Sequence, residues 1–385
     1  MTPRCLVFYI SGHGFGHASR DIEVVNALHR RDPGVHLIVR TAASRWLFDL
    51  TLEAPVEFHE TECDTGVVQI DSLRLDPAAT VARAADFYDG WPALVQREAQ
   101  FLRDVGARLV VADIPPLGCA AAHAALIPSV ALSNFTWDWI YEAYLPRGAE
   151  APAFLSMIRQ AYRTARHTLR LPMCGGFAAM DPSTIADIPL VARRARRAAA
   201  DTRAALGLPP DLALVLLSFG GYGLENIRAE GLDASRYGVV ATDEIGIRPP
   251  EVSPARPAPG DIASRGSAPV FMIAEPALYG AGFRYEDLVA ACDVVVSKPG
   301  YGIIAECAAN GVALLYTSRG HFAEYDVLVE ALPALVRSRF IPQADLLAGR
   351  WQPYLDALLA EPRPPAPPAT NGAELAADAI LGWMA

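Results

Sequence analysis

Lysine is almost missing from this 385-residue sequence, because only Lys298 among the 33 basic residues is a lysine. Long apolar runs are missing as well, and none approaches the roughly 18 residues that a membrane span needs. The first residues, MTPRCLVFYIS, lack the apolar core and cleavage site of a signal peptide. Six cysteines form no CxxC pair, which favours reduced thiols over a zinc site or disulfide framework. These absences predict a soluble, cytoplasmic protein.

Motifs of several large enzyme classes are also absent. The sequence contains no DxD metal–diphosphate motif, GxxxxGKS phosphate loop, GxSxG elbow or HExxH metal site. We therefore expect no metal and no cofactor. The excess of 43 acidic over 33 basic residues gives a net charge of −10, which repels nucleic acids and anionic lipids. The predicted partners are therefore small molecules.

Short apolar runs alternate with helical patterns along the whole chain. The predicted buried strands are 5–10, 35–40, 108–113, 127–132, 212–219, 237–242, 268–274, 291–297 and 312–317. Longer helical patterns cover 78–105, 192–205 and 343–360. This alternation predicts an α/β protein with doubly wound, mostly parallel sheets. The length suits two domains, predicted at 1–190 and 191–370, and a helix in 371–385 is expected to pack back on the first domain.

A glycine-rich loop, GHGFGHASR, follows the first predicted strand at 12–20. The glycines of this loop are Gly12, Gly14 and Gly16, and Phe15 lies between the last two. Without side chains, glycines allow a ligand to approach the backbone and the N-terminus of the following helix closely. His13 and His17 are two of only eight histidines, and at this sheet edge they are candidate catalytic groups. The alternative is that one histidine caps the helix and the other is solvated.

Asp113 ends the predicted strand 108–113 and should lie at the same sheet edge as the histidine loop. A carboxylate in this position can accept the ring N–H of a histidine and fix its tautomer. Position alone equally allows Asp113 to be an N-cap for the next helix. Both roles are therefore open at this point.

The second half has its own candidate binding loops. The segment VVVSKPGYGIIAE (294–306) is predicted to form a strand, a tight turn and a helix. The N–H groups of the turn can bind a diphosphate, to which Lys298 adds a positive charge, and Glu306 can accept hydrogen bonds from ribose hydroxyls. The candidate residues are Ser297, Lys298, Pro299, Gly300, Tyr301, Gly302 and Glu306, with Gly220 and Gly221 in a neighbouring loop. The loop 318–326 adds Arg319, His321 and Glu324 as sugar-binding candidates. The alternatives are a structural turn and an ordinary surface loop.

Two further groups are ambiguous. The arginines of the 192–205 helical pattern are interpreted as a solvated helix face, with an anion site as the alternative: Arg193, Arg194, Arg196 and Arg197. Four aromatic residues can stack on an acceptor or belong to the core: Trp91, Trp137, Trp139 and Tyr141.

These ordered motifs resemble the GT-B glycosyltransferases, such as the UDP-glycosyltransferases and the bacterial peptidoglycan N-acetylglucosaminyltransferase. GHGFGH is similar to their first acceptor-side loop, which implies that His17 is the general base and that Asp113 is its partner. A further resemblance is to the N-terminal, glycosyltransferase-like region of plant L-arabinokinases, carried by five segments: GHGFGHASRDIEVV, SNFTWDWIYEAYL, DIPLVARR, KPGYGIIAE and LLAGRWQPYLDALL. The PxxxGLxSSA loop of the kinase half does not occur here, so we do not infer a kinase.

The resemblance implies a GT-B fold with two Rossmann-like domains facing across a cleft. It also implies an inverting, metal-independent transfer of sugar from a nucleotide donor, expected to be UDP-linked, to an acceptor hydroxyl. Two alternatives are a nucleotide-sugar-binding module without transfer activity and a nucleotide-sugar 2-epimerase of the same fold. The acceptor is not readable from the sequence.

Overall fold

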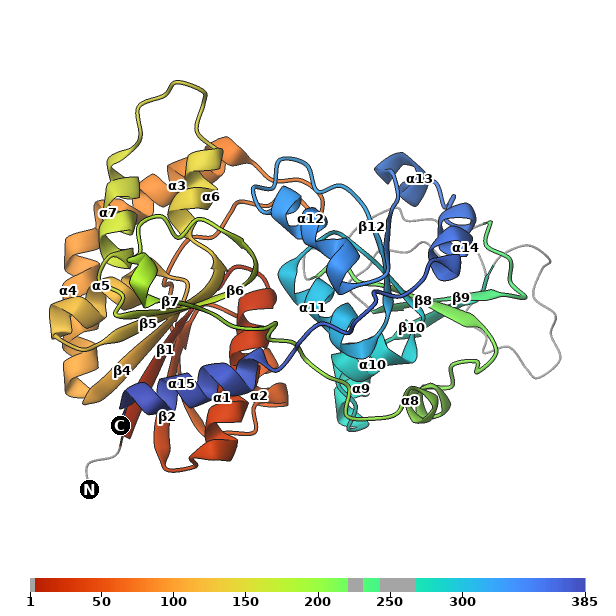
Figure 1. Cartoon of the computed structure of the whole chain (residues 1–385), viewed down its shortest axis with the longest axis horizontal. Helices are drawn as coiled ribbons and strands as arrows, with labels where there is room; N and C mark the ends of the chain where they lie inside the picture. The colour runs from red at the N-terminus through yellow and green to blue at the C-terminus, as the bar shows by residue number, and fades with distance from the viewer. Residues whose placement is uncertain (1–3, 221–230, 243–267, 385) are drawn as a thin grey trace.

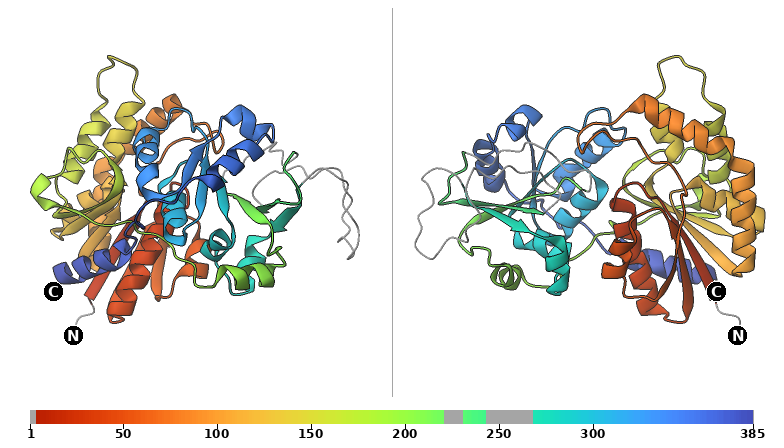
Figure 2. Two further views of the ribbon diagram at one scale, coloured as in Figure 1. Left: turned by 45° about the vertical axis from the view of Figure 1, so that its right-hand side comes forward. Right: turned by 180° about the vertical axis from the view of Figure 1, so that it is seen from behind.

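A computed structural model describes residues 4–220, 231–242 and 268–384. Two parallel β-sheets, each covered by helices, form the two halves of the molecule (Figure 1). Figure 2 shows the same two halves turned by 45° and from behind, with both ends of the described chain on the same half. Among the described residues, none of the helices has both the length and the apolar character that crossing a membrane requires.

The N-terminal sheet has seven strands in the order β3-β2-β1-β4-β5-β6-β7, and each pair of neighbouring strands is parallel. The strands are β1 (Arg4–Ile10), β2 (Val35–Thr41), β3 (Val56–Glu60), β4 (Ala107–Asp113), β5 (Ser129–Phe135), β6 (His167–Gly175) and β7 (Ile185–Asp187). The helices are α1 (Gly16–Arg31), α2 (Arg45–Thr51), α3 (Pro77–Asp89), α4 (Trp91–Asp104), α5 (Pro116–Ala125), α6 (Trp137–Ala143) and α7 (Ala153–Tyr162).

Side-chain alternation along β1 divides the core of this half into two layers. Leu6, Phe8 and Ile10 pack in one cluster with residues of α1 such as Ile22. Cys5, Val7 and Tyr9 pack in the other cluster with residues of α4 and α5. Because successive side chains of a strand point to opposite faces, an all-apolar strand requires helices on both sides.

The C-terminal sheet has six strands in the order β10-β9-β8-β11-β12-β13, also parallel. The strands are β8 (Ala213–Leu217), β9 (Tyr237–Thr242), β10 (Val270–Ile273), β11 (Val294–Ser297), β12 (Ala313–Tyr316) and β13 (Ser338–Phe340). The helices are α8 (Ala199–Leu206), α9 (Glu275–Gly280), α10 (Tyr285–Ala291), α11 (Tyr301–Asn310), α12 (Tyr325–Leu335), α13 (Gln343–Leu347) and α14 (Gln352–Ala360).

The chain crosses between the two halves twice, and the two crossing segments lie side by side. Val191 and Asn371 form an antiparallel bridge, and the Leu190 N–H donates to the Ala369 carbonyl at 3.2 Å. After the second crossing, helix α15 (Gly372–Met384) returns to the N-terminal half and packs against α1 (Figure 1). Arg31 of α1 forms an ion pair with Asp378, and the Trp383 ring stacks on His167 with centroids 4.0 Å apart.

The three long helical patterns were predicted with the wrong extents. The 78–105 pattern is two helices, because the chain turns at Gly90 and Pro92 in the first turn of α4 has no N–H for an intrahelical bond. The 343–360 pattern is likewise divided into α13 and α14, near Gly349, whose φ is +75°. In the 192–205 pattern only α8 is helical, because backbone groups before it bond to a distant side chain: the Arg196 and Arg197 N–H groups donate to Asp287 Oδ1 at 2.7 and 3.0 Å.

Gly372 begins α15 where the two crossing segments touch, and a Cβ there would lie 2.2 Å from the Pro189 carbonyl oxygen. We predict that Gly372→Ala lowers the free energy of unfolding by about 1–3 kcal/mol, because the backbones must separate. Urea denaturation measures the change. The matched control is Gly382→Ala in the same helix, where a Cβ meets nothing within 4 Å and helix propensity makes the change neutral or stabilising. Equal stability of the two variants would contradict close packing at Gly372.

Candidate functional site

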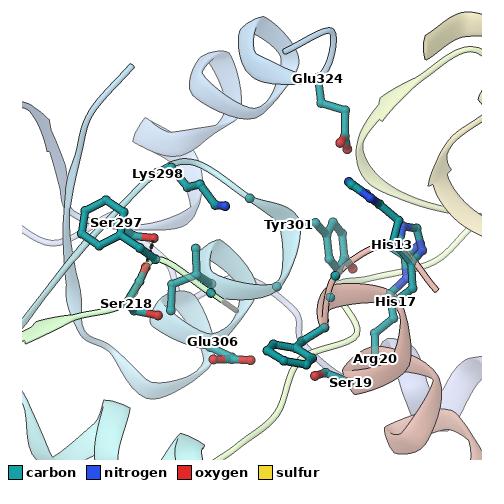
Figure 3. Close-up of a pocket in the computed structure, with 18 of the residues that line it drawn as sticks. His13, His17, Ser19, Arg20, Ser218, Ser297, Lys298, Tyr301, Glu306 and Glu324 are labelled. Carbon is teal, nitrogen blue, oxygen red and sulfur yellow. Dashed lines mark hydrogen bonds between the residues drawn. The ribbon is translucent and has the colours of Figure 1, made fainter. Parts of the chain in front are cut away.

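A cavity of about 250 Å³ lies between the two halves, lined by residues of both. The N-terminal half contributes the loop after β1 and the start of α1, and the C-terminal half contributes the segments after β8 and β11. In Figure 3, His13, His17 and Arg20 lie on one side, while Ser218, Ser297 and Glu306 lie on the other. Ligands of open parallel sheets bind at such carboxyl edges. The cavity is therefore the candidate active site.

His17 and Asp113 are in contact at the N-terminal side of this cavity. His17 Nδ1 lies 3.0 Å from Asp113 Oδ1, and the carboxyl group is fully buried behind the ring. Burial opposes ionisation of Asp113, but the Arg20 charge outweighs it and holds the pKa of Asp113 well below its usual range. The Arg20 Nη2 also lies 3.0 Å from His17 Nδ1, and a guanidinium can only donate whereas a carboxylate can only accept. The contact with Asp113 is therefore a hydrogen bond in the tautomer that carries the proton on Nδ1. Asp113 is not the N-cap of α5, because that position is Pro115.

Arg20 organises this corner of the site, and the sequence analysis did not single it out. Its guanidinium forms a two-pronged ion pair with Asp113 and donates to Asn134 Oδ1 at 2.7 Å and Ser133 Oγ at 3.1 Å. Asn134 in turn donates to Glu324 of the C-terminal half at 2.9 Å. Arg20 also lies over the Tyr301 ring, 5.0 Å from its centroid. The signal was present in the sequence, since Arg20 follows His17 by three residues on the same helix face.

His13 lies beside His17 in the cavity wall and is neutral. Burial lowers the pKa of His13 well below its ordinary value, and the positive charge of Arg319 lowers it further. The His13 ring packs edge-on against Trp137, with centroids 6.0 Å apart. A neutral imidazole can accept or donate one hydrogen bond to a ligand hydroxyl. Gln69 Nε2 lies 3.3 Å from His13 Nε2.

The loop after β11 leads directly into α11, whose N-cap Gly300 contributes no side-chain cap. The N–H groups of the first turn therefore point to the cavity without a side-chain acceptor, as an anion site requires. Lys298 extends into the cavity (Figure 3). Burial lowers the pKa of Lys298 well below its usual value, and the neighbouring charge of Arg319 lowers it further. A bound anion would restore the preference for the charged ammonium.

Glu306 lines the cavity but is already paired with Arg193. The Arg193 guanidinium donates to Glu306 Oε1, from Nε at 2.8 Å and also from Nη2, and it lies 3.7 Å from Glu286. Glu306 Oε2 is buried without a hydrogen-bond partner among the described residues. Burial raises the pKa of Glu306, and Arg193 partly offsets the rise. The interpretation of Arg193 as part of a solvated helix face is wrong, because two buried carboxylates attract its side chain from an extended segment.

Most of the predicted site residues line this one cavity. Those of the N-terminal half are His13, Gly14, Phe15, Gly16 and His17. Those of the C-terminal half are Gly220, Ser297, Lys298, Gly300, Tyr301, Gly302, Glu306, Arg319 and Glu324. The Tyr301 hydroxyl accepts from the Val191 N–H at 3.0 Å, so it joins the loop to the first crossing segment.

The remaining predicted residues lie elsewhere. Gly12 and Pro299 are outside the lining, and His321 is exposed at the surface. Gly12 packs against Ala42, which a Cβ at Gly12 would approach to 2.9 Å. Gly221 lies outside the described residues.

Three of the four predicted acceptor aromatics belong to the core, since Trp91, Trp137 and Tyr141 are buried. Trp137 nevertheless lines the cavity with part of its ring, while its Nε1–H donates to Asp64 at 2.8 Å. Burial raises the pKa of Asp64 to about 6, although its hydrogen bonds favour the charged form. Trp137 therefore both packs in the core and lines the cavity.

Comparison with known proteins supports the architecture. No protein-family model matches the sequence. The L-arabinokinase of Arabidopsis thaliana is 29% identical over 377 residues, covering 96% of this chain and 33% of that protein. The chain thus spans about a third of the length of this curated relative. Its likeness therefore covers one region of that protein.

Solved glycosyltransferases share the fold over the whole chain. The calicheamicin glycosyltransferase CalG4 superposes with a TM-score of 0.56 at 18% identity, covering 100% of this chain and 96% of that one. UGT89C1 of Arabidopsis thaliana, solved with quercetin, gives 0.56 at 14% identity, covering 98% and 92%. The same enzyme solved with UDP-L-rhamnose gives 0.55 at 14% identity, covering 100% and 99%. The predicted fold is confirmed: the chain has the GT-B fold, with two Rossmann-like domains.

Arg193 is the only guanidinium bonded to Glu306 among the described residues, so its removal should leave a buried carboxylate unpaired. We predict that Arg193→Met costs about 3–5 kcal/mol of unfolding free energy at about pH 7. The loss should shrink at about pH 5, because a carboxyl with a raised pKa contributes stability at low pH and loses it as pH rises through that pKa. Urea denaturation at both pH values measures this.

Two controls sharpen this test. Arg197→Met changes an exposed arginine of the same segment and should cost less than about 1 kcal/mol. The double variant Arg193→Met/Glu306→Gln should regain part of the loss, because Glu306 no longer carries a buried charge while the buried Glu286 still lacks Arg193. An equal loss at both pH values would show that Arg193 acts through packing alone.

Proposed function

We propose that the protein is an inverting glycosyltransferase that moves a sugar from a nucleotide donor, most simply UDP-linked, to a hydroxyl of a small-molecule or glycan acceptor without a metal. The observation that carries the proposal is one cavity with His17, backed by the buried Asp113, on one side and the N-terminus of α11 with Lys298 on the other. This arrangement supports a base for the acceptor and a diphosphate site on opposite walls.

The C-terminal half would bind the donor. The free N–H groups at the start of α11 and the Lys298 ammonium suit a diphosphate, and the unpartnered Oε2 of Glu306 suits a ribose hydroxyl. The solved complexes of UGT89C1 with UDP and with UDP-L-rhamnose support a nucleotide donor for this fold. Ser297 and Gly220 would line the same side of the donor.

Transfer would be a single displacement at the anomeric carbon. His17 Nε2 takes the proton of the acceptor hydroxyl as the new C–O bond forms, and the bond from carbon to the diphosphate oxygen breaks with inversion. Asp113 holds the Nδ1–H and stabilises the imidazolium that results. The leaving diphosphate gains negative charge, which the α11 N-terminus and Lys298 stabilise.

The acceptor would lie against the N-terminal wall. Phe135, Trp137 and Ile140 line the cavity there with His13 and Gln69. These side chains give an apolar face with two hydrogen-bonding groups, which suits a small molecule presenting one hydroxyl. UGT89C1 has been solved with quercetin, so this fold can hold a small molecule besides a nucleotide.

His17→Ala tests the base. We predict that the variant loses about 100- to 10,000-fold in transfer rate, because it lacks the proton acceptor, while UDP binding stays unchanged. Release of UDP from a panel of UDP-sugars and acceptors measures transfer, and calorimetry measures binding. His321→Ala is the matched control, because that histidine is exposed and outside the cavity. Near-full activity of His17→Ala would refute the base assignment, whereas UDP-sugar binding without turnover in the unaltered protein would refute transfer.

Lys298 tests the diphosphate site. Because the free protein lowers the pKa of Lys298 and a diphosphate favours the ammonium, UDP affinity should fall as pH rises through that lowered pKa. Lys298→Met should weaken UDP by about tenfold at low pH and flatten the pH dependence. Lys298→Arg, which stays charged, should keep the affinity and lose only the pH dependence. Calorimetry across the pH range measures the UDP affinity of each protein, with dTDP and GDP compared in parallel. A Lys298→Met profile identical to that of the unaltered protein would remove Lys298 from the site.

A further inference from the structure

A second cavity of about 480 Å³ lies in the C-terminal half and shares no lining residue with the first. It is lined by the start and inner face of α8, by the ends of α10 and α11, and by Arg337 before β13. Arg363 reaches it from the proline-rich segment between α14 and α15. We propose that this cavity is a binding site for a small phosphorylated molecule.

The charge of the lining is the first argument. Three arginines and one carboxylate line the cavity: Arg203, Arg337, Arg363 and Asp293. Asp293 Oδ2 accepts from Arg203 and from the Leu214 N–H, each at 2.8 Å. Among the described residues no ion pair joins Arg337 or Arg363 to this carboxylate, in a chain whose net charge is −10. A bound anion would relieve this local excess of positive charge.

Unused donors are the second argument. Arg337 donates from Nη1 to the Leu359 carbonyl at 3.1 Å, but its Nε–H is buried without a partner among the described residues. Burial and the neighbouring charge of Arg363 lower the pKa of Arg337, and the charges of Asp293 and Glu361 partly offset this fall. A buried N–H group without a hydrogen bond costs free energy, and an acceptor oxygen of a ligand would recover it. The planar guanidinium matches phosphate oxygens in particular.

The start of α8 adds backbone donors to the same cavity. Its N-cap, Ala198, has no side chain that can accept a hydrogen bond. Ala199 and Ala200 line the cavity in the first turn, where N–H groups have no intrahelical acceptor and short side chains allow close approach. A phosphate at this position meets the positive end of the helix dipole. The cavity volume is large enough for the organic part of the molecule as well.

Asn310 connects this cavity with the candidate active site. It lines the second cavity, and its Nδ2 donates to the Arg193 carbonyl at 3.1 Å and to the Glu306 carbonyl at 2.9 Å. Arg193 and Glu306 line the first cavity. A ligand held beside Asn310 therefore contacts the end of the helix, α11, whose other end faces the first cavity.

Calorimetric titration of the full chain with ribose 5-phosphate tests the site, with ribose as the uncharged control. Lys298→Gln is included so that binding in the first cavity is recognised. Arg363→Gln removes an exposed charge, and Ala200→Glu places a carboxylate in the first turn of α8, where the helix dipole favours it. Neither change should disturb folding, which circular dichroism checks. Arg339→Gln is the matched control, because Arg339 pairs with Glu361 outside the cavity.

We expect saturable binding of ribose 5-phosphate, about tenfold weaker in Arg363→Gln and in Ala200→Glu, and unchanged in Arg339→Gln and Lys298→Gln. Three results would overturn the site: no binding to the unaltered chain, an affinity in Arg363→Gln and Ala200→Glu that equals that of the unaltered chain, or loss of binding in Lys298→Gln. The last result would assign the binding to the first cavity. Because no transfer assay is used, this test is independent of the proposed glycosyltransferase activity.

Discussion

The buried ion pair between Arg20 and Asp113 is the interaction on which the candidate active site depends. It joins the first turn of α1 to the end of β4, and both partners are almost fully enclosed. An isolated charge at either position would be costly, so each residue requires the other. The pair keeps Asp113 ionised beside His17 Nδ1, and Arg20 also bonds Asn134, which donates to Glu324 of the other half. One guanidinium thus supports both the His17–Asp113 contact and the contact between the two halves.

A second buried guanidinium has the same role on the opposite wall. Arg193 leaves the first crossing segment, pairs with Glu306 and stands close to Glu286. In both positions the arginine satisfies several acceptors at once, with a planar group that stays charged when buried. A lysine ammonium in such a place loses its proton more readily, and Lys298, whose pKa is lowered, illustrates the difference. The rarity of lysine therefore coincides with a structure in which buried arginines join distant segments through ion pairs and hydrogen bonds.

Local patterns predicted those parts of the structure that local chemistry controls. Buried strands such as β1, β4 and β11 are continuous apolar runs, and the glycine-rich loops after them mark the sheet edge. The edge strands β3, β7 and β13 were missed, because half-exposed short strands have no such run. The interior strand β6 was missed as well, because polar and half-exposed residues interrupt its apolar run. Helix boundaries were also missed where backbone N–H groups bond to a distant side chain, as at Arg196 and Asp287.

The sequence by itself determined the two α/β halves, the histidine loop and the Lys298 loop, because strand burial and tight turns are specified by neighbouring residues. Only the tertiary structure decided which side chains meet. Arg20 and Asp113 are separated by 93 positions and Arg193 and Glu306 by 113, and no local pattern reports either pair. The same long-range packing excluded His321 from the cavity and moved Arg193 from the expected solvent face into it. Burial of opposite charges depends on how the two halves dock, and docking is a property of the whole chain rather than of any segment.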